Sequence, residues 1–149
     1  MPTFNTTRFG EITYNNKDII RFVKPILGFN ELSHYVLITR PESEPFKWLQ
    51  SLDDPDICFV VIDPRLVMDQ YMVDVSMHDI KLLEGTEVQE DYQLLVIATI
   101  PRGHPEEMSV NLQGPIVIFI KHLTALQMVL NNPEYDIRHS IFQKSKTAS

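Results

Sequence analysis

Short runs of β-branched and aromatic residues, separated by turn residues, make up most of this chain. Residues 58–62 form one such run, which Asp63-Pro64 closes, and residues 92–100 form the longest, which Pro101 stops. Five glycines and ten prolines divide the chain into pieces that suit brief strands better than long helices. The remaining predicted strands span residues 6–9, 11–14, 18–22, 34–38, 46–52, 109–112, 116–121 and 125–130.

The run at residues 46–52 alternates along its length, so successive side chains point to opposite faces of a strand. Phe46 and Trp48 face one way, and Leu49 faces the other. Because both faces carry large apolar groups, we expect this strand to be covered on both sides.

One segment follows helical rather than strand spacing. Ser76, with Asp79 three residues later, resembles a capping box. Met77, Ile80 and Leu83 then recur at the spacing of one helix face. We therefore predict one short helix that runs from Ser76 to Leu83.

Closely spaced short strands without alternating helices favour an antiparallel sheet, and sheets of this size commonly close into a barrel. A length of 149 residues is typical of one domain. We therefore predict an all-β fold with one short helix, arranged as a single antiparallel β-barrel-like domain over residues 1–142. The polar residues 143–149 are predicted to form a disordered tail.

Charge is unevenly distributed along the chain. Thirteen lysines and arginines against twenty acids give a net charge of −7, and no basic stripe of the kind that nucleic-acid binding needs is present. Residues 69–91 hold seven acids and one base, a net charge of −6. This segment is either a solvated face or a surface that attracts a basic partner and repels polyanions.

Several features favour a cytoplasmic protein. Residues 1–8 are polar and show no apolar core of a secretory signal. The longest apolar stretches, residues 94–100 and 115–120, are shorter than the about 18 residues that a membrane helix needs. The single cysteine, Cys58, lies in an apolar run, where a free thiol usually behaves as a small buried hydrophobic group.

Motifs for catalysis or cofactor binding are missing from the sequence. Neither glycine-rich phosphate motif occurs, no G-x-S-x-G is found, and the five histidines are scattered. His104 with Glu106 and Glu107 is a weak candidate for metal binding. The acidic turn Asp53-Asp54-Pro55-Asp56 is open to three interpretations, namely a structural turn, a partner contact and a cation site. We predict no enzyme activity, no cofactor and no metal.

Two adjacent blocks carry a resemblance to a known family. Residues 45–56 read Pro-Phe-Lys-Trp-Leu-Gln-Ser-Leu-Asp-Asp-Pro-Asp, and residues 58–64 read Cys-Phe-Val-Val-Ile-Asp-Pro. Together they closely resemble the central motif of the FliW family of flagellar assembly factors. The chain departs from the family pattern at Phe119, where Asn is frequent in the family. It also departs at Val23 and Pro25, which replace the Pro and Gly common in the loop before residues 28–29. Further matches lie in order on both sides of these two blocks, at residues 8–12, 26–29, 94–101, 108–112, 114–118 and 132–139.

The resemblance implies a β-barrel-like binding protein with two competing partners and no catalysis. One partner is flagellin, bound in the cytoplasm before export. The other is CsrA, an RNA-binding translational repressor that FliW-like proteins sequester so that flagellin mRNA is translated. Neither nucleic acid nor a membrane is expected to bind directly.

Eight residues are candidates for partner contact. They are Trp48, Gln50, Asp53, Asp54 and Asp56 from the motif, and Glu84, Glu87 and Glu90 from the acidic segment. The alternative for Trp48 is a core position, and the alternative for the acids of the turn is a structural role.

The main alternative function is a small-ligand-binding β-barrel, since eight Phe, five Tyr and one Trp are available to line a cavity.

Overall fold

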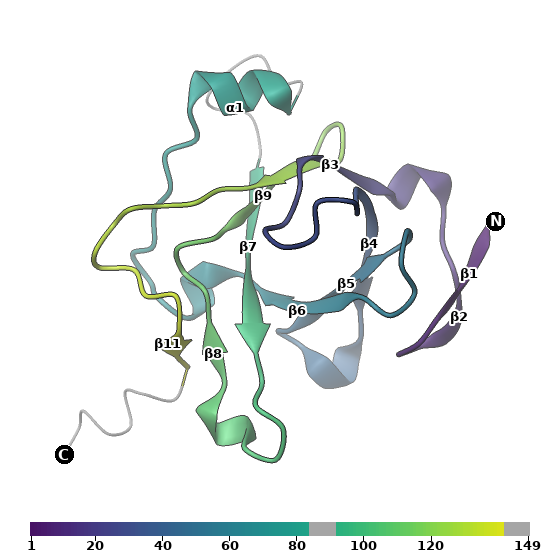
Figure 1. The fold of residues 1–149 in the computed structure, drawn as a ribbon, viewed down its shortest axis with the longest axis horizontal. Coiled ribbons are helices and arrows are strands. Elements are labelled where there is room, and N and C mark those ends of the chain that lie inside the picture. Colours follow the sequence, from purple (N-terminus) through teal and green to yellow (C-terminus); the bar gives the residue numbers. More distant parts are fainter. Residues whose placement is uncertain (84–91, 142–149) are drawn as a thin grey trace.

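The computed structural model describes residues 1–83 and 92–141, and most of the regular structure in these residues is β-strand (Figure 1). The strands are β1 (Thr3–Thr6), β2 (Gly10–Thr13), β3 (Ile20–Lys24), β4 (His34–Thr39), β5 (Lys47–Ser51), β6 (Cys58–Ile62), β7 (Tyr92–Thr99), β8 (Ser109–Val110), β9 (Ile116–Phe119), β10 (Thr124–Gln127) and β11 (His139–Ser140). The helices are α1 (Met77–Leu82) and the short 3₁₀ helices η1 (Asn16–Asp18), η2 (Pro41–Ser43), η3 (Pro64–Leu66) and η4 (Pro105–Glu107).

The main sheet closes on itself. Its ring runs β3-β4-β5-β6-β7-β9-β10 and returns to β3, with β8 and β11 added beside β7. The predicted all-β, barrel-like fold with one short helix is confirmed. The β10–β3 pair is parallel, where an antiparallel sheet was predicted throughout. A closed ring with an odd number of strands cannot alternate direction at every step, so one parallel pair is required.

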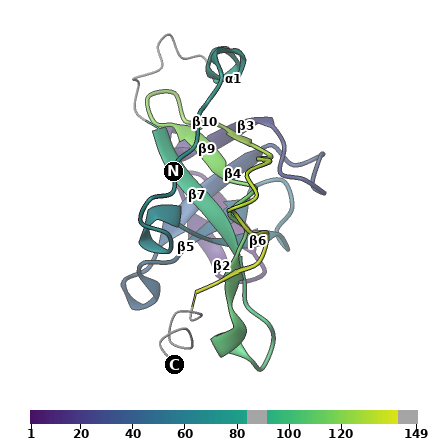
Figure 2. The same ribbon diagram turned by 90° about the vertical axis from the view of Figure 1, so that its left-hand side faces the viewer.

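Helix α1 and η4 lie at opposite ends of the barrel. Figure 1 shows α1 above the end of the barrel at β3 and β9, and the turn that contains η4 extends beyond β7 and β8 at the other end. Figure 2, turned by 90°, keeps the same arrangement and shows β7 running diagonally between the two ends. The β1–β2 hairpin stands apart as its own two-stranded sheet.

Side chains fill the barrel interior. Tyr35, Leu49 and Val61 are fully buried at its centre. Phe22 packs edge-on against Tyr35 with ring centroids 4.9 Å apart. This packing argues against the small-ligand-binding barrel, whose ligand occupies the interior. The same cluster contains Ile20, Phe22, Ile26, Tyr35, Leu49, Val61, Leu95, Ile116, Ile118 and Ala125.

Strand β5 is covered on both faces, as predicted. Leu49 packs in the barrel core, and the N-terminal hairpin covers the opposite face. There the Phe9 ring meets Trp48 in a T-shaped contact with centroids 5.5 Å apart. The guanidinium groups of Arg8 and Arg40 lie over Trp48 at 4.7 Å and over Phe9 at 5.2 Å. Alternating rings and cations fix the hairpin to the barrel.

The predicted strand at residues 6–9 is wrong in position. β1 ends at Thr6, and residues 7–9 form the hairpin turn. The Thr6 hydroxyl donates to the Gly10 carbonyl at 2.8 Å and accepts the Phe9 N–H at 2.8 Å. Gly10 has a φ of +68°, which a glycine adopts without strain.

The predicted helix is confirmed, and its docking changes the interpretation of the acidic segment. The Ser76 hydroxyl accepts the Asp79 N–H at 3.1 Å. Asp79 is 8% exposed and pairs with the Lys24 ammonium of β3 at 3.0 Å. The Thr124 hydroxyl donates to the Leu83 carbonyl at 2.6 Å. Asp79 is therefore an internal acid and not part of a solvated face. No helix in the described residues is long and apolar enough to cross a membrane.

Candidate protein-binding face

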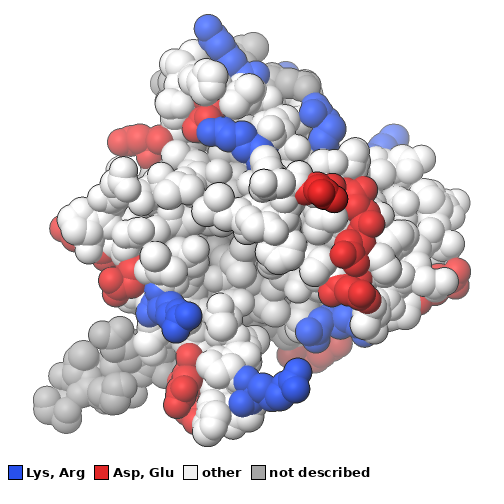
Figure 3. All heavy atoms as spheres, viewed as in Figure 1, with Lys and Arg blue, Asp and Glu red and all other residues white. Residues whose placement is uncertain are grey.

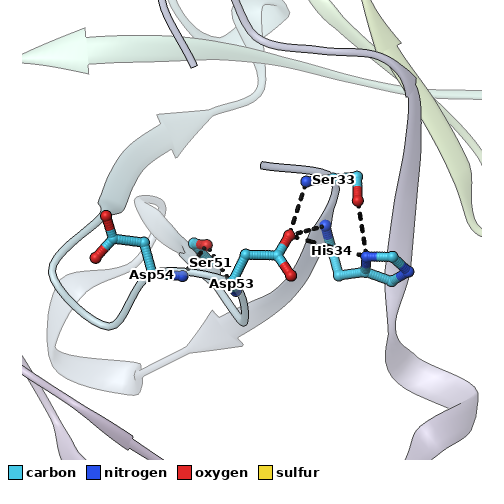
Figure 4. A network of polar contacts seen from close by, with 5 residues as sticks. All are labelled: Ser33, His34, Ser51, Asp53 and Asp54. Carbon is cyan, nitrogen blue, oxygen red and sulfur yellow. Dashed lines mark hydrogen bonds and ion pairs between the residues drawn. The ribbon is translucent and has the colours of Figure 1, made fainter. Parts of the chain in front are cut away.

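The acidic turn between β5 and β6 is held by side-chain to backbone hydrogen bonds. The Ser51 hydroxyl, at the end of β5, accepts the N–H groups of Asp53 at 3.0 Å and Asp54 at 2.9 Å (Figure 4). The Asp54 carboxylate accepts the Asp56 N–H at 2.9 Å. These bonds are the turn-forming contacts typical of serine and aspartate. The turn is fixed before any partner arrives.

Asp53 connects this turn to the start of β4. One carboxylate oxygen accepts the N–H groups of Ser33 at 2.8 Å and His34 at 3.0 Å (Figure 4). Burial by itself raises the pKa of Asp53, but the two N–H donors and the nearby His34 ring outweigh it. The net effect holds the pKa of Asp53 below its ordinary value.

The lowered pKa of Asp53 predicts a loss of stability in acid. Asp53 stabilises the fold fully above its ordinary pKa, and this contribution disappears as the pH falls through the lowered, folded-state pKa. We expect Asp53→Asn to flatten the dependence of the unfolding midpoint on pH between about pH 5 and pH 2. The side chain is 35% exposed, so the expected effect is about 1 kcal/mol.

Urea unfolding of both proteins at several pH values in this range measures the difference. Asp69→Asn, at an exposed acid of the described chain, is the control and should leave the profile unchanged. A profile of the Asp53 variant that parallels the unmodified protein would contradict the assignment.

Gln50 supports the turn from beneath. It is fully buried, and its amide nitrogen donates to the carbonyls of Ser51 at 3.0 Å, Ile57 at 3.2 Å and Pro55 at 3.4 Å. Because no part of this side chain reaches the surface, a partner at this face meets the turn, while Gln50 positions it. Trp48 is half-buried under the hairpin, and its indole N–H donates to the Ser43 hydroxyl at 3.3 Å.

Acidic side chains gather at the surface around this turn. Asp53 and Asp56 are exposed, and the Asp56 carboxylate accepts the Thr7 hydroxyl of the hairpin. Glu31 and Asp54 line one hollow of about 430 Å³. Figure 3 shows a row of acidic side chains on this side of the molecule, over β4 and β5. We call Glu31, Asp53, Asp54 and Asp56 the acidic face.

The carboxylates of the acidic face form few ion pairs. Among the described residues, Glu31, Asp54 and Asp56 form no ion pair, and Asp53 has only the His34 ring at 3.8 Å. Glu84, Glu87 and Glu90 lie outside the described residues. Sequence reasoning found the three aspartates and missed Glu31, because only the fold places the loop before β4 beside the β5–β6 turn.

Two other candidate groups are accounted for by their surroundings. Cys58 is half-buried, and burial raises the pKa of its thiol to about 11, although the Arg8 charge lowers it. A thiol of this kind is a poor nucleophile at neutral pH. His104, Glu106 and Glu107 bring ligand atoms within 4.8 Å of one another, but all three are exposed. A hydrogen bond of 3.3 Å joins His104 to Glu106.

Comparison with known proteins places this fold in one family. The family model described as FliW protein matches residues 3–141. The flagellar assembly factor FliW of Caldanaerobacter subterraneus is 41% identical over 145 residues, covering 97% of this chain and 95% of that protein. The FliW of Leptospira biflexa is 36% identical over 150 residues, covering 99% and 95% of the two chains.

The structural comparison agrees with the sequences. A crystal structure of the flagellar assembly factor FliW superimposes with a TM-score of 0.84 at 33% identity and covers 95% of this chain and 97% of that one. The relatives are assembly factors rather than enzymes, in line with the lack of a catalytic motif in the sequence. This chain belongs to the FliW family of flagellar assembly factors.

Proposed function

We propose that this protein works in the cytoplasm, where it binds flagellin and, when free of flagellin, binds and antagonises the translational repressor CsrA. Accumulating flagellin occupies the protein and frees the repressor, so flagellin translation stops. Exported flagellin releases the protein, which again restrains the repressor. Mutually exclusive binding is sufficient for this regulation, and no chemical step is needed.

The acidic face is the observation that supports this proposal. A repressor that binds RNA presents basic surface, because phosphate contacts dominate RNA affinity. Carboxylates fixed by a hydrogen-bonded turn attract that surface, and the turn loses little conformational entropy on binding because it is already ordered. Once docked, they also oppose the approach of RNA phosphates.

Charge reversal on the acidic face tests the proposal. We expect Glu31→Lys/Asp56→Lys to weaken binding to purified CsrA about tenfold or more and to flatten its salt dependence. Both residues are exposed, so the fold should persist, as circular dichroism can verify. Calorimetric titration at several salt concentrations measures both quantities. Reversal at Glu84, Glu87 and Glu90 is a separate variant for the acidic segment.

The control is Glu42→Lys/Asp69→Lys, which makes the same change in net charge at exposed positions away from the face. It should bind CsrA almost as the unmodified protein does. Flagellin added to the complex should displace CsrA. If reversal on the acidic face and reversal at the control positions have equal effects, the acidic face is not the CsrA site. If neither purified flagellin nor CsrA binds, the proposed function is wrong.

A further inference from the structure

A second surface lies where the N-terminal hairpin meets the barrel, apart from the acidic face. A cleft of about 500 Å³ opens there between residues 11–14 of the hairpin and residues 36–38 of β4. Leu37 and Leu123, both half-buried, contribute apolar surface to it. The cleft therefore combines an apolar lining with the side of a strand.

The direction of the backbone groups of β4 follows from two hydrogen bonds. The Ser33 carbonyl accepts the Phe22 N–H of β3 at 2.8 Å. The His34 carbonyl accepts the Leu52 N–H, beyond β5, at 2.8 Å. Since backbone groups alternate along a strand, odd-numbered residues of β4 face β3 and even-numbered residues face β5.

β3 covers only the first part of this edge. Its pairing with β4 begins at Ile20, opposite Tyr35, and does not reach further along β4. The N–H and C=O groups of Leu37 and Thr39 point to the same side, and no strand of the described residues pairs with them there. An unpaired strand edge is a ready template for another strand.

The charges at the cleft are predominantly negative. Glu11 and Asp18 line it, both are exposed, and neither forms an ion pair among the described residues. The third charged group is Arg40, whose guanidinium is already stacked over the Phe9 ring at 5.2 Å. A lysine or arginine on an incoming chain complements the two free carboxylates.

We propose that this cleft binds an extended, basic and apolar peptide segment of a protein partner, which adds to β4 as a strand. Its backbone pairs with Leu37 and Thr39, and an apolar side chain covers Leu37 and Leu123. The next side chain along, on the opposite face, carries the positive charge toward Glu11 and Asp18. This binding site is separate from the acidic face. It adds a second type of contact, strand addition, to the charge-driven contact proposed above.

A synthetic peptide of alternating valine and lysine, about eight residues long, is the probe. We expect it to bind the full chain and to slow hydrogen exchange of the Leu37 and Thr39 amides, measured by NMR. A valine–glutamate peptide of the same length should bind at least about tenfold more weakly. Protection of those two amides separates strand addition from contact through side chains alone.

Matched variants locate the binding. Thr13 lines the cleft and is exposed, so Thr13→Trp should fill the cleft and abolish peptide binding. Thr3 pairs with Thr13 across the hairpin and does not line the cleft, so Thr3→Trp should bind normally. Glu11→Lys/Asp18→Lys should also weaken binding about tenfold. The Glu31→Lys/Asp56→Lys variant of the acidic face should retain it, which separates this inference from the proposed function.

The inference would be overturned if the valine–lysine peptide did not bind, or if it bound without protecting the Leu37 and Thr39 amides. Equally tight binding of the valine–glutamate peptide would also overturn it. Equal loss in the Thr13→Trp and Thr3→Trp variants would show that the peptide binds elsewhere on the hairpin.

Discussion

Replacing Gln50 with glutamate is expected to lower the free energy of unfolding by about 3–5 kcal/mol at neutral pH. The change preserves the shape of a fully buried side chain but replaces its donor by a carboxylate oxygen. That oxygen would face the carbonyls of Ser51, Pro55 and Ile57, which now accept from the amide. For a chain of this size the loss corresponds to a fall of about 10 °C or more in Tm.

The pH dependence identifies the cause. Burial raises the pKa of an introduced carboxyl, and the neutral acid can donate one hydrogen bond to a carbonyl. The penalty is therefore largest above the raised pKa of the folded state and shrinks as the pH falls through it. Thermal unfolding at pH values from about 7 down to 4 measures this recovery.

Gln70→Glu is the matched control, because Gln70 is exposed and undergoes the same isosteric change. It should alter the free energy of unfolding by no more than about 0.5 kcal/mol. An equal effect at both positions would mean that the hydrogen bonds of Gln50 do not hold the acidic turn. A folded but loosened turn should also weaken the CsrA binding that we propose, because the carboxylates of the acidic face would lose their fixed positions.

Replacing Lys24 with methionine is expected to lower the free energy of unfolding by about 2 kcal/mol. The variant keeps most of the apolar stem but leaves the Asp79 carboxylate, 8% exposed, without its cation. The effect is smaller than for a fully buried pair, because the Lys24 side chain is 43% exposed and water can reach the site. Hydrogen exchange at Ile80 should report a loosened α1.

A double-mutant cycle separates the ion pair from other effects. Lys24→Met/Asp79→Asn should recover a part of the lost stability, since it removes the charge that Lys24→Met leaves buried. Lys81→Met, at an exposed lysine of the same helix, is the control and should change stability little. If the double variant is less stable than Lys24→Met by the full cost of Asp79→Asn alone, the two side chains are not coupled.

Local chemistry made several elements predictable from the sequence. The bounds of β6 agree with the prediction, because a β-branched and aromatic run ends there at Asp63-Pro64, where the proline cannot donate to a sheet. Helix α1 was predicted from the Ser76 cap and helical spacing, which act within one turn. The Phe46–Trp48 alternation also indicated that β5 is covered on both faces.

Elements that depend on distant contacts were not predictable. β11 has only two residues and exists because they pair with β8. Residues 7–9 form a turn and not the predicted strand. This turn depends on a hydrogen bond to the Thr6 side chain and on the contact between Phe9 and Trp48, which the alternation of apolar and polar residues does not reveal. The sequence groups Asp79 with the other acids of residues 69–91, whose segment is predicted to be a solvated or partner-binding surface, because the sequence does not reveal that Lys24 pairs with Asp79.

The sequence by itself determined the family, the all-β character, the short helix and the acidic turn, because each is encoded by neighbouring residues that act within a few positions. The tertiary structure decided the rest. It closed an odd-numbered ring through one parallel pair and joined Glu31 to the three aspartates as one acidic face. It also left the backbone N–H and C=O groups of Leu37 and Thr39, beside a cleft, without a strand partner among the described residues. These features depend on which strands become neighbours, and the pattern along a single chain does not specify that.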